Sequence, residues 1–281
     1  MKINVAKSSG FCFGVRRAID IGLRLAKGKK NVFVLGDIVH NSFVVKNLSE
    51  KGIKRIDRIC KTKNSPILII SAHGRSQKVF QKAKECGYRI VDATCPKVKD
   101  IYRIARKLEK NNKIIIIGDR GHDEVKGIAG QLEKRPVIIE SPDGINKRSL
   151  ARIKKAAVVT QSTQTAENIN AIMEVLAGII PKIKLYDTTC RITKIKQQEI
   201  RSLPEENDVI LIVGSRTSAN TRNLYKIAKK INKRTHWIES ERDLEKSWFK
   251  DVKKVGIMAG ASTPDEVVEK IASELKRRRY R

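Results

Sequence analysis

Short apolar runs recur along this chain, and the residues that end each run recur as well. One set of runs ends in glycine, a second ends in small polar residues, and a third ends in cysteine. Two sets of these end residues have nearly the same spacing along the chain. One set is Gly36, Gly118 and Gly214, and the other is Cys12, Cys95 and Cys190. A module of roughly ninety residues, used three times, explains both spacings.

The apolar runs are predicted to be buried parallel strands, because each is short, aliphatic and bounded by glycine or polar residues. The runs that end in glycine cover residues 32–36, 114–118 and 209–214. Those that end in small polar residues cover 67–74, 156–162 and 255–262. Those that end in cysteine cover 90–95 and 185–190, and the stretch 3–5 before Cys12 is a looser third member.

Helical patterns lie between these runs, at residues 15–27, 98–109, 193–202 and 264–278, with Pro264 suited to a first helical turn. Strands that alternate with helices predict an α/β fold with small parallel sheets. We expect three modules related by a pseudo-threefold axis, with the boundaries 14–96, 97–192 and 193–281 plus 1–13. Ligands of such sheets bind beyond the carboxyl ends of the strands, where the unusual polar residues of this chain lie.

The charge and the hydropathy of the chain limit the classes of protein to which it can belong. The chain has 281 residues, of which 40% are hydrophobic, so it can bury a sizeable core. Its formal net charge of +30 suits nucleic-acid binding, steering of anions or a solvated surface. Outside the run 276–281 the basic residues are dispersed, which favours a solvated surface. No apolar run has the length of a membrane helix, and Lys7 interrupts any signal peptide, so we expect a cytoplasmic protein without a membrane partner.

Five widely spaced cysteines argue for reduced thiols rather than a disulfide framework. Cys12, Cys95 and Cys190 each fall at a predicted strand-to-helix turn, one in each module. Thiols that converge at a common axis would hold an iron–sulfur cluster or a zinc ion. A 4Fe-4S cluster with three protein ligands leaves one iron open for a substrate. The alternative is three buried structural cysteines, the role that we expect for Cys60 and Cys86.

Three of the four histidines also follow predicted strand ends. They are His40, His73 and His122, and they indicate a common pocket, although packed histidines are the alternative. His236 has no comparable setting and is expected to be structural or exposed. The third module offers small hydroxyl and amide groups instead, namely Ser218, Asn220 and Ser262. At strand-to-helix turns such groups bind anions, so with the histidines they predict a diphosphate site; helix capping is the alternative.

Two acids, Asp123 and Glu124, follow His122 ahead of a predicted helix. A carboxyl group near a cluster can protonate a departing hydroxyl as a general acid. The residues alone do not choose between the two acids, although the longer Glu124 reaches further. The alternative is a helix N-terminal acid that interacts with the helix dipole. The hydroxyl groups between Thr160 and Thr163 could complete a relay to this acid.

These motifs together resemble the LytB or IspH family, the 4-hydroxy-3-methylbut-2-enyl diphosphate reductases of the non-mevalonate isoprenoid pathway. The likeness runs from Cys12 to Ser262. It is carried, in order, by Gly10–Val15, Val39–Asn41, Ser71–Gly74, Asp92–Pro96, Gly121–Val125, Thr160–Gln161, Asp187–Cys190 and Ala259–Ser262.

The resemblance implies three α/β modules around a central 4Fe-4S cluster, with Cys12, Cys95 and Cys190 as the ligands. It implies an allylic diphosphate substrate bound by His40, His73, His122, Ser162, Ser218, Asn220 and Ser262. The implied proton source is Glu124, assisted by the hydroxyl of Ser162. The implied reaction is a two-electron reductive dehydroxylation that yields isopentenyl and dimethylallyl diphosphates. A ferredoxin or flavodoxin is the implied kind of electron donor.

The sequence departs from the family pattern at several places. Ser162 stands where the family typically has threonine, Ala219 replaces a serine, and the segment 191–197 diverges. None of these changes removes a ligand or the acid. Two alternatives remain: an inactive homologue that retains the fold and binds a diphosphate, and a basic nucleic-acid-binding protein. The chain has no nucleic-acid-binding motif and few aromatic residues, so we do not expect nucleic acid as a partner.

Overall fold

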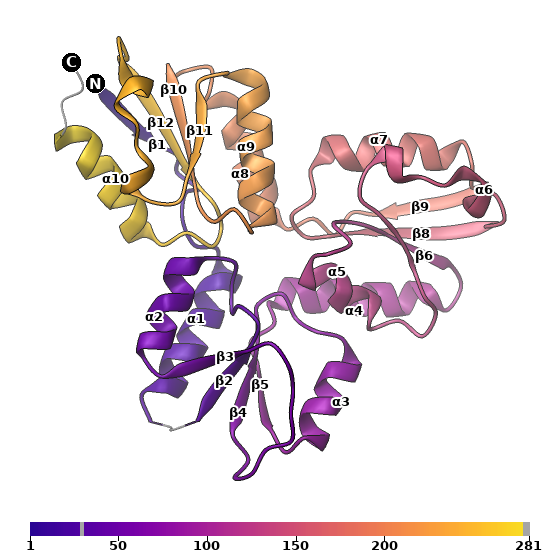
Figure 1. Cartoon of the computed structure of the whole chain (residues 1–281). Coiled ribbons are helices and arrows are strands. Elements are labelled where there is room, and N and C mark those ends of the chain that lie inside the picture. Colours follow the sequence, from indigo (N-terminus) through magenta and orange to yellow (C-terminus); the bar gives the residue numbers. More distant parts are fainter. Residues whose placement is uncertain (29–30, 278–281) are drawn as a thin grey trace. The chain divides into compact units, whose positions relative to one another are not determined.

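The computed structural model describes residues 1–28 and 31–277. It contains three four-stranded sheets, and every neighbouring pair of strands in them is parallel. Helices pack on the sheets, so the predicted α/β fold with small parallel sheets is confirmed (Figure 1). Arg278, the last residue of the predicted helix 264–278, lies outside the described residues.

The first sheet has the order β3-β2-β4-β5. Its strands are β2 (Val32–Leu35), β3 (Ile53–Ile56), β4 (Ile67–Ile70) and β5 (Arg89–Asp92). Leu68 and Ile70 pack with Ala83 of α3 (Gln77–Glu85). Helix α1 (Phe13–Ala26) approaches the edge strand, where Gly22 lies against Ile53, and α2 (Ser42–Glu50) follows it in the chain.

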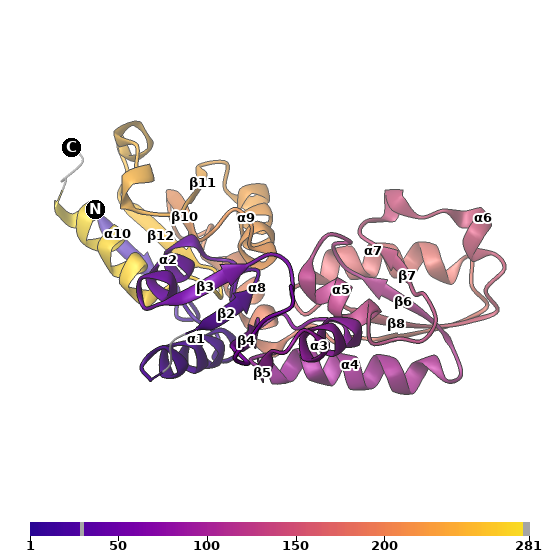
Figure 2. The same cartoon turned by 60° about the horizontal axis from the view of Figure 1, so that its bottom comes forward.

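The second sheet has the order β7-β6-β8-β9. Its strands are β6 (Lys113–Ile117), β7 (Val137–Ile139), β8 (Lys155–Thr160) and β9 (Lys182–Tyr186). Because side chains alternate along a strand, Ile114 and Ile116 pack with α4 (Pro96–Glu109) and α5 (Asp123–Ala129). Ile115 and Ile117 pack with α7 (Ala166–Ala177), on the opposite face (Figure 2). A 3₁₀ turn (Pro142–Gly144) and α6 (Lys147–Leu150) lie between β7 and β8.

The third sheet has the order β1-β12-β10-β11. Its strands are β1 (Lys2–Val5), β10 (Val209–Val213), β11 (Thr235–Ile238) and β12 (Lys254–Ala259). Leu211 and Ile257 face α10 (Asp265–Arg277), whereas Ile210 and Ile212 face α8 (Arg191–Ser202) and α9 (Ala219–Ile231). Two 3₁₀ turns, Glu241–Asp243 and Lys246–Phe249, connect β11 to β12.

All three sheets repeat one strand order. Counted from β3, β7 and β11, an edge strand without a landmark residue comes first. The strand that ends in glycine and the strand that ends in small polar residues follow it, and the strand that ends in cysteine forms the other edge. The nine strands predicted from the apolar runs are all present. The strands β3, β7 and β11 were not predicted, because they are short and partly exposed and no glycine, small polar or cysteine landmark of the repeat follows them.

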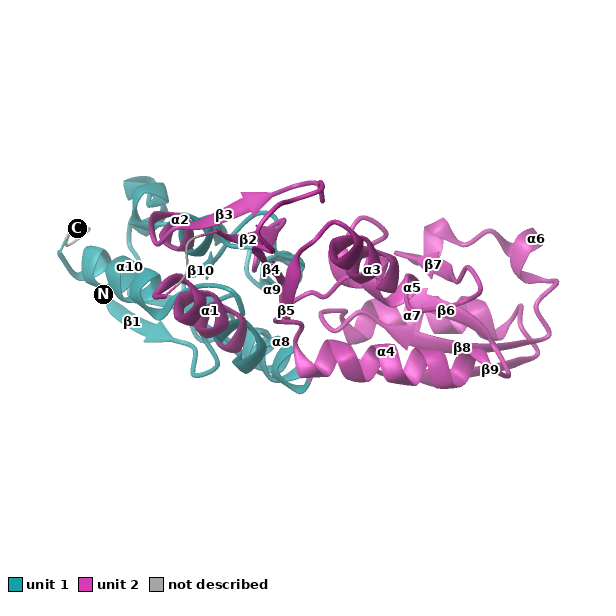
Figure 3. Cartoon of the chain, turned by 90° about the horizontal axis from the view of Figure 1, so that it is seen from below, with its two compact units in different colours: residues 1–16, 39–46, 191–281 teal, residues 17–38, 47–190 magenta. Residues whose placement is uncertain are grey.

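The chain forms two compact units (Figure 3). One consists of Met1–Arg16, Val39–Lys46 and Arg191–Arg281 and contains the third sheet. The other consists of Arg17–Ile38 and Asn47–Cys190 and contains the first two sheets. The module boundaries expected from the repeat stay predictions. Among the described helices, none combines the length and the apolar character needed to cross a membrane.

Candidate active site

Three cysteines occupy equivalent positions in the three sheets. Each follows the last strand of its sheet and immediately precedes the first residue of a helix, α1 after Cys12, α4 after Cys95 and α8 after Cys190. Each backbone N–H donates to a carbonyl two residues beyond the end of the neighbouring strand. The three bonds are Cys12 N to Ala261 O at 3.0 Å, Cys95 N to Ala72 O at 3.0 Å, and Cys190 N to Ser162 O at 2.9 Å.

The donor set of these turns fits an iron–sulfur cluster. None of the three cysteines forms a disulfide, all three are partly buried, and each lies at a helix N-terminus, where the helix dipole favours a negative charge. The Val15 N–H points at the Cys12 sulfur, at 3.5 Å, the type of hydrogen bond that tunes cluster sulfurs. The two other thiols lie elsewhere: Cys60 is exposed, and Cys86 caps the C-terminus of α3.

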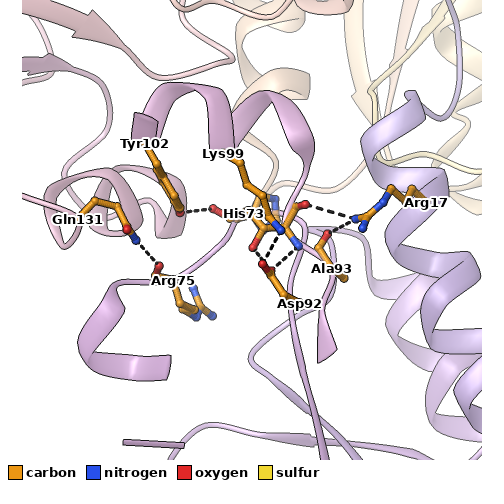
Figure 4. Close-up of polar contacts among 9 residues, drawn as sticks. Arg17, His73, Arg75, Asp92, Ala93, Lys99, Tyr102 and Gln131 are labelled. Atoms are coloured by element: carbon orange, nitrogen blue, oxygen red, sulfur yellow. Dashed lines mark hydrogen bonds and ion pairs between the residues drawn. The ribbon is translucent and has the colours of Figure 1, made fainter. Parts of the chain in front are cut away.

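The turn before Cys95 is held by charged side chains (Figure 4). One carboxylate oxygen of Asp92 accepts bonds from the backbone N–H and the hydroxyl of Thr94, and the other pairs with Lys99 at 2.6 Å. Burial raises the pKa of Asp92, but the bonds from Lys99 and Thr94 outweigh burial and hold that pKa below its ordinary value. Arg17 donates to the two carbonyls before the cysteine, both at 3.3 Å. These contacts fix the backbone that carries Cys95.

His73 and His122 lie together in the larger unit. Their rings meet edge to face, with centroids 5.4 Å apart. The Nδ1 atom of His122 accepts the Glu124 N–H at 3.1 Å and caps α5, so its ring proton is on Nε2. Tyr102 donates its hydroxyl to the His73 carbonyl at 3.4 Å (Figure 4). Burial raises the pKa of Tyr102 above its ordinary value, which keeps this hydroxyl a donor.

Glu124 and Ser162 form a buried pair. The Ser162 N–H donates to one carboxylate oxygen at 2.6 Å, and the Ser162 hydroxyl donates to the other at 2.7 Å. Glu124 is only 2% exposed, and burial raises its pKa although both bonds oppose the shift. Asp123 instead forms an ion pair with Arg75, at 2.5 Å, and remains partly exposed. The two adjacent acids therefore have different environments, and Glu124 has the one suited to holding a proton.

The hydroxyl of Thr160 faces the turn before Cys190. The Thr188 N–H donates to the Thr160 hydroxyl at 3.0 Å, and the Thr160 N–H donates to the Thr188 hydroxyl at 2.8 Å. This reciprocal pair ties the end of β8 to the turn that carries Cys190. The Ser162 hydroxyl, two residues further on, bonds directly to Glu124.

Polar groups gather at the strand ends of the smaller unit. Ser218 caps α9 by accepting the Thr221 N–H, and Ser262 donates to the His40 carbonyl at 3.0 Å. Asn220 is 5% exposed, and neither polar atom of its amide has a hydrogen-bond partner within residues 1–28 and 31–277. A buried amide without partners is costly and is typical of a site that a polar ligand completes.

Comparisons with known proteins identify the family of this chain. Residues 3–276 match the LytB protein family. The chain belongs to the LytB family. It is 36% identical to the 4-hydroxy-3-methylbut-2-enyl diphosphate reductases of Escherichia coli (strain K12 / DH10B) and Escherichia fergusonii, over 98% of this chain and 90% of theirs.

Two solved structures resemble this LytB protein over 99% of its length. One, from Plasmodium falciparum, is described as E-1-hydroxy-2-methyl-but-2-enyl-4-diphosphate reductase; it has a TM-score of 0.91, 28% identity and 89% of its own chain covered. The other is described as (E)-4-hydroxy-3-methyl-but-2-enyl diphosphate reductase, the terminal enzyme of the non-mevalonate pathway. Its TM-score is 0.72, with 31% identity and all of its chain covered.

The predicted site residues of this LytB protein divide between the two compact units. The larger unit contains Cys95, Cys190, His73, His122, Glu124 and Ser162, and the smaller one contains Cys12, His40, Ser218, Asn220 and Ser262. Sequence reasoning missed Arg17, Arg75 and Tyr102, which act through contacts distant in the sequence. For Tyr102 a signal exists, since a tyrosine on the buried stripe of α4 needs a partner for its hydroxyl.

Proposed function

We propose that this protein is a 4-hydroxy-3-methylbut-2-enyl diphosphate reductase. The observation that carries the proposal is the set of three cysteines, none in a disulfide, at equivalent strand-to-helix turns, each with the same backbone hydrogen bond to the neighbouring turn. Membership of the LytB family and the names of its relatives support the same activity. We further propose that three modules, 14–96, 97–192 and 193–281 plus 1–13, surround a 4Fe-4S cluster.

The proposed reaction replaces the C–OH bond of the substrate by a C–H bond. It consumes two electrons and two protons and releases one water, and the products are isopentenyl and dimethylallyl diphosphates. The cluster, held by Cys12, Cys95 and Cys190, would supply the electrons and an iron with an open coordination position. A ferredoxin or flavodoxin would deliver these electrons, and the cytoplasm is the proposed location.

Glu124 is the proposed proton source. Its burial keeps the carboxyl protonated at a pH where an exposed glutamate is ionised. The neutral acid can protonate the departing hydroxyl, which then leaves as water. The carboxylate that results accepts the two bonds from Ser162, at 2.6 and 2.7 Å, so the charge formed in this step is stabilised at once.

The proposed diphosphate ligands are His40, His73, His122, Ser162, Ser218, Asn220 and Ser262. The Nε2–H of His122 can donate to a phosphate oxygen, because its Nδ1 is used by the helix cap. The amide of Asn220 can donate as well, since no described residue takes its hydrogen bonds. Hydrogen bonds to an anion are stronger than those between neutral groups, so each lost donor should raise the KM.

The test is an anaerobic turnover assay of the full chain. The protein is reconstituted with iron and sulfide, its iron and sulfide contents are counted, and oxidation of reduced methyl viologen is followed with and without the substrate. We expect dye oxidation that depends on the substrate, with both isoprenyl diphosphates as products. Cluster-loaded protein that fails to oxidise the dye in the presence of the substrate would identify an inactive homologue and reject the proposal.

A further inference from the structure

Lys196 is a lysine in the interior of the protein. It lies on the buried stripe of α8 together with Thr193, Gln197 and Ile200, and it is only 1% exposed. Lysine is almost never buried to this degree unless it is paired, because its charge loses the water around it. The position therefore needs an explanation beyond packing.

Three backbone carbonyls accept the protons of the Lys196 ammonium group. They belong to Ala259, at 3.1 Å, to Gly10, at 3.2 Å, and to Ser8. An ammonium group has three donors, so this set completes its hydrogen bonding. Burial lowers the pKa of Lys196 to about 8, and the charges of Cys12, Glu199 and Asp265 act in the opposite direction. The group is thus mostly charged at neutral pH, which strengthens its hydrogen bonds to the carbonyls.

The three carbonyls lie on both sides of the Cys12 turn. Ser8 and Gly10 belong to the loop between β1 and the cysteine, and Ala259 is the last residue of β12. Two residues beyond Ala259, the Ala261 carbonyl accepts the Cys12 N–H at 3.0 Å. Lys196 therefore ties the loop before the cysteine to the strand end to which the cysteine itself is bonded.

The loop before Cys12 fits closely against its surroundings. Gly10 has a φ of +87°, and a Cβ atom at this position would come within 2.0 Å of a carboxylate oxygen of Asp265. Glu199, about one turn after Lys196 in α8, accepts the backbone N–H groups of Lys7 at 2.5 Å and Ser8 at 2.9 Å. Helix α8 thus binds this loop in two ways: Lys196 donates to carbonyls of the loop, and Glu199 accepts from its backbone N–H groups.

We propose that Lys196 is a positioning residue that fixes the loop before Cys12 through the three backbone carbonyls that its ammonium group binds. The inference rests on the proposed function. Hydrogen bonds from a charged donor are stronger than those between neutral groups, so these three bonds resist displacement of the loop. Groups that orient a metal ligand raise the affinity of the site for its metal, and the Cys12 sulfur depends on this loop for its position.

The test compares two uncharged variants, Lys196→Gln and Lys196→Met, with Lys196→Arg, which keeps the charge. In cluster-loaded full-length protein, we expect the uncharged variants to release iron to a chelator about tenfold faster, as for other residues that support metal ligands. Their kcat should fall with an unchanged KM, and Lys196→Arg should recover part of each property.

A second measurement requires neither cluster nor substrate. In cluster-free protein, the backbone amides of residues 8–12 should exchange with deuterium about threefold or more faster in the Lys196→Gln variant, because the loop that carries them loses the bonds to its carbonyls. Amides of β6 and β8, in the second sheet, should exchange at an unchanged rate and serve as the internal control. Amide exchange and iron release equal to those of the wild type would overturn the inference. Absence of turnover in wild-type protein would instead reject the proposed function, and the exchange result would still be decisive.

Discussion

Ser162 donates one hydrogen bond to each carboxylate oxygen of Glu124, from its backbone N–H at 2.6 Å and from its hydroxyl at 2.7 Å. The two residues come from the start of α5 and the turn after β8. Burial favours the neutral acid and the two bonds favour the carboxylate. Burial prevails, so the pKa of Glu124 lies above its ordinary value. A general acid needs this balance, since it must hold a proton and then release it.

We expect Glu124→Gln to remove turnover while the cluster remains bound. Glutamine keeps the shape of the side chain and cannot supply the proton. The kcat should fall by roughly 10²–10⁴-fold, the usual contribution of a general acid. The iron and sulfide contents should match those of the wild type, because no cysteine changes. Wild-type rates in this variant would remove Glu124 from the mechanism.

We expect Ser162→Ala to lower the kcat by roughly 10- to 100-fold. The change deletes a hydrogen bond to a buried carboxylate, and such bonds contribute about 1.5–3 kcal/mol. Ser162→Thr is the matched control, because it keeps the hydroxyl and should retain activity within a small factor. If the alanine and threonine variants had equal rates, the hydroxyl would have no part in proton delivery.

The pH dependence of kcat/KM should have an alkaline limb that belongs to Glu124. The acid is active when protonated, and burial raises its pKa, so activity should persist to a higher pH than an exposed glutamate allows. Above the raised pKa the rate should fall about tenfold per pH unit. A pH–rate profile measures this limb. Its retention in the Glu124→Gln variant, in whatever activity remains, would assign it to another group.

The sequence predicted the strands that end at the site and missed the strands that do not. The predicted strands that end in glycine or in small polar residues are aliphatic runs buried over most of their length, as in Val209–Val213. The strands β1, β5 and β9 are partly exposed, and the cysteine that follows each of them made them recognisable. The edge strand Ile53–Ile56 carries Lys54 and Arg55 between its apolar ends, and half of it is exposed. Its pairing with β2 depends on hydrogen bonds to a neighbour in the sheet, which the local pattern does not contain.

The part of the candidate site that could be predicted consists of reactive residue types that follow the end of a strand. The cysteines, the histidines and Glu124 all follow apolar runs. The contacts that orient them come from elsewhere in the chain: Arg17 reaches the turn before Cys95, and Lys196 reaches the loop before Cys12. Such pairs are far apart in sequence, so only the folded chain reveals them. The choice between Asp123 and Glu124 likewise needed the burial of one and the ion pair of the other.

We expect Gly74→Ala to destabilise the protein. Gly74 has a φ of +74°, and a Cβ atom there would lie 2.2 Å from the Tyr102 hydroxyl oxygen and 2.9 Å from Thr94. The backbone conformation alone should reduce the free energy of unfolding by about 1–3 kcal/mol, and the contact with Tyr102 adds to this loss. Urea unfolding followed by circular dichroism measures the change.

Gly178→Ala is the control for this experiment. Gly178 ends α7 with a φ of −75°, and a Cβ atom there would have its nearest neighbour 3.6 Å away, an ordinary contact. Alanine at this position should change the free energy of unfolding by about 0.5 kcal/mol or less. Equal stability of the two variants would contradict the close approach of Tyr102 to the turn after His73.

We expect Asn220→Leu to weaken substrate binding without loss of stability. The amide of Asn220 is buried and has no described hydrogen-bond partner, so the ligand-free protein carries its desolvation cost. Leucine has the same branching and the same number of side-chain heavy atoms and is apolar, and it removes two unsatisfied atoms that each cost about 1–3 kcal/mol. The free energy of unfolding should therefore stay equal or rise, whereas the KM should increase about tenfold or more because an anion loses a donor.

The control is Lys226→Leu, at an exposed position of the same helix α9. It should leave the KM unchanged, so the pair of variants separates the amide of Asn220 from a general effect on the helix. A stability loss in Asn220→Leu with an unchanged KM would show that the amide supports the fold. The opposite result, a raised KM in a protein at least as stable, assigns the amide to the ligand, because only a binding group is both costly to bury and needed for activity.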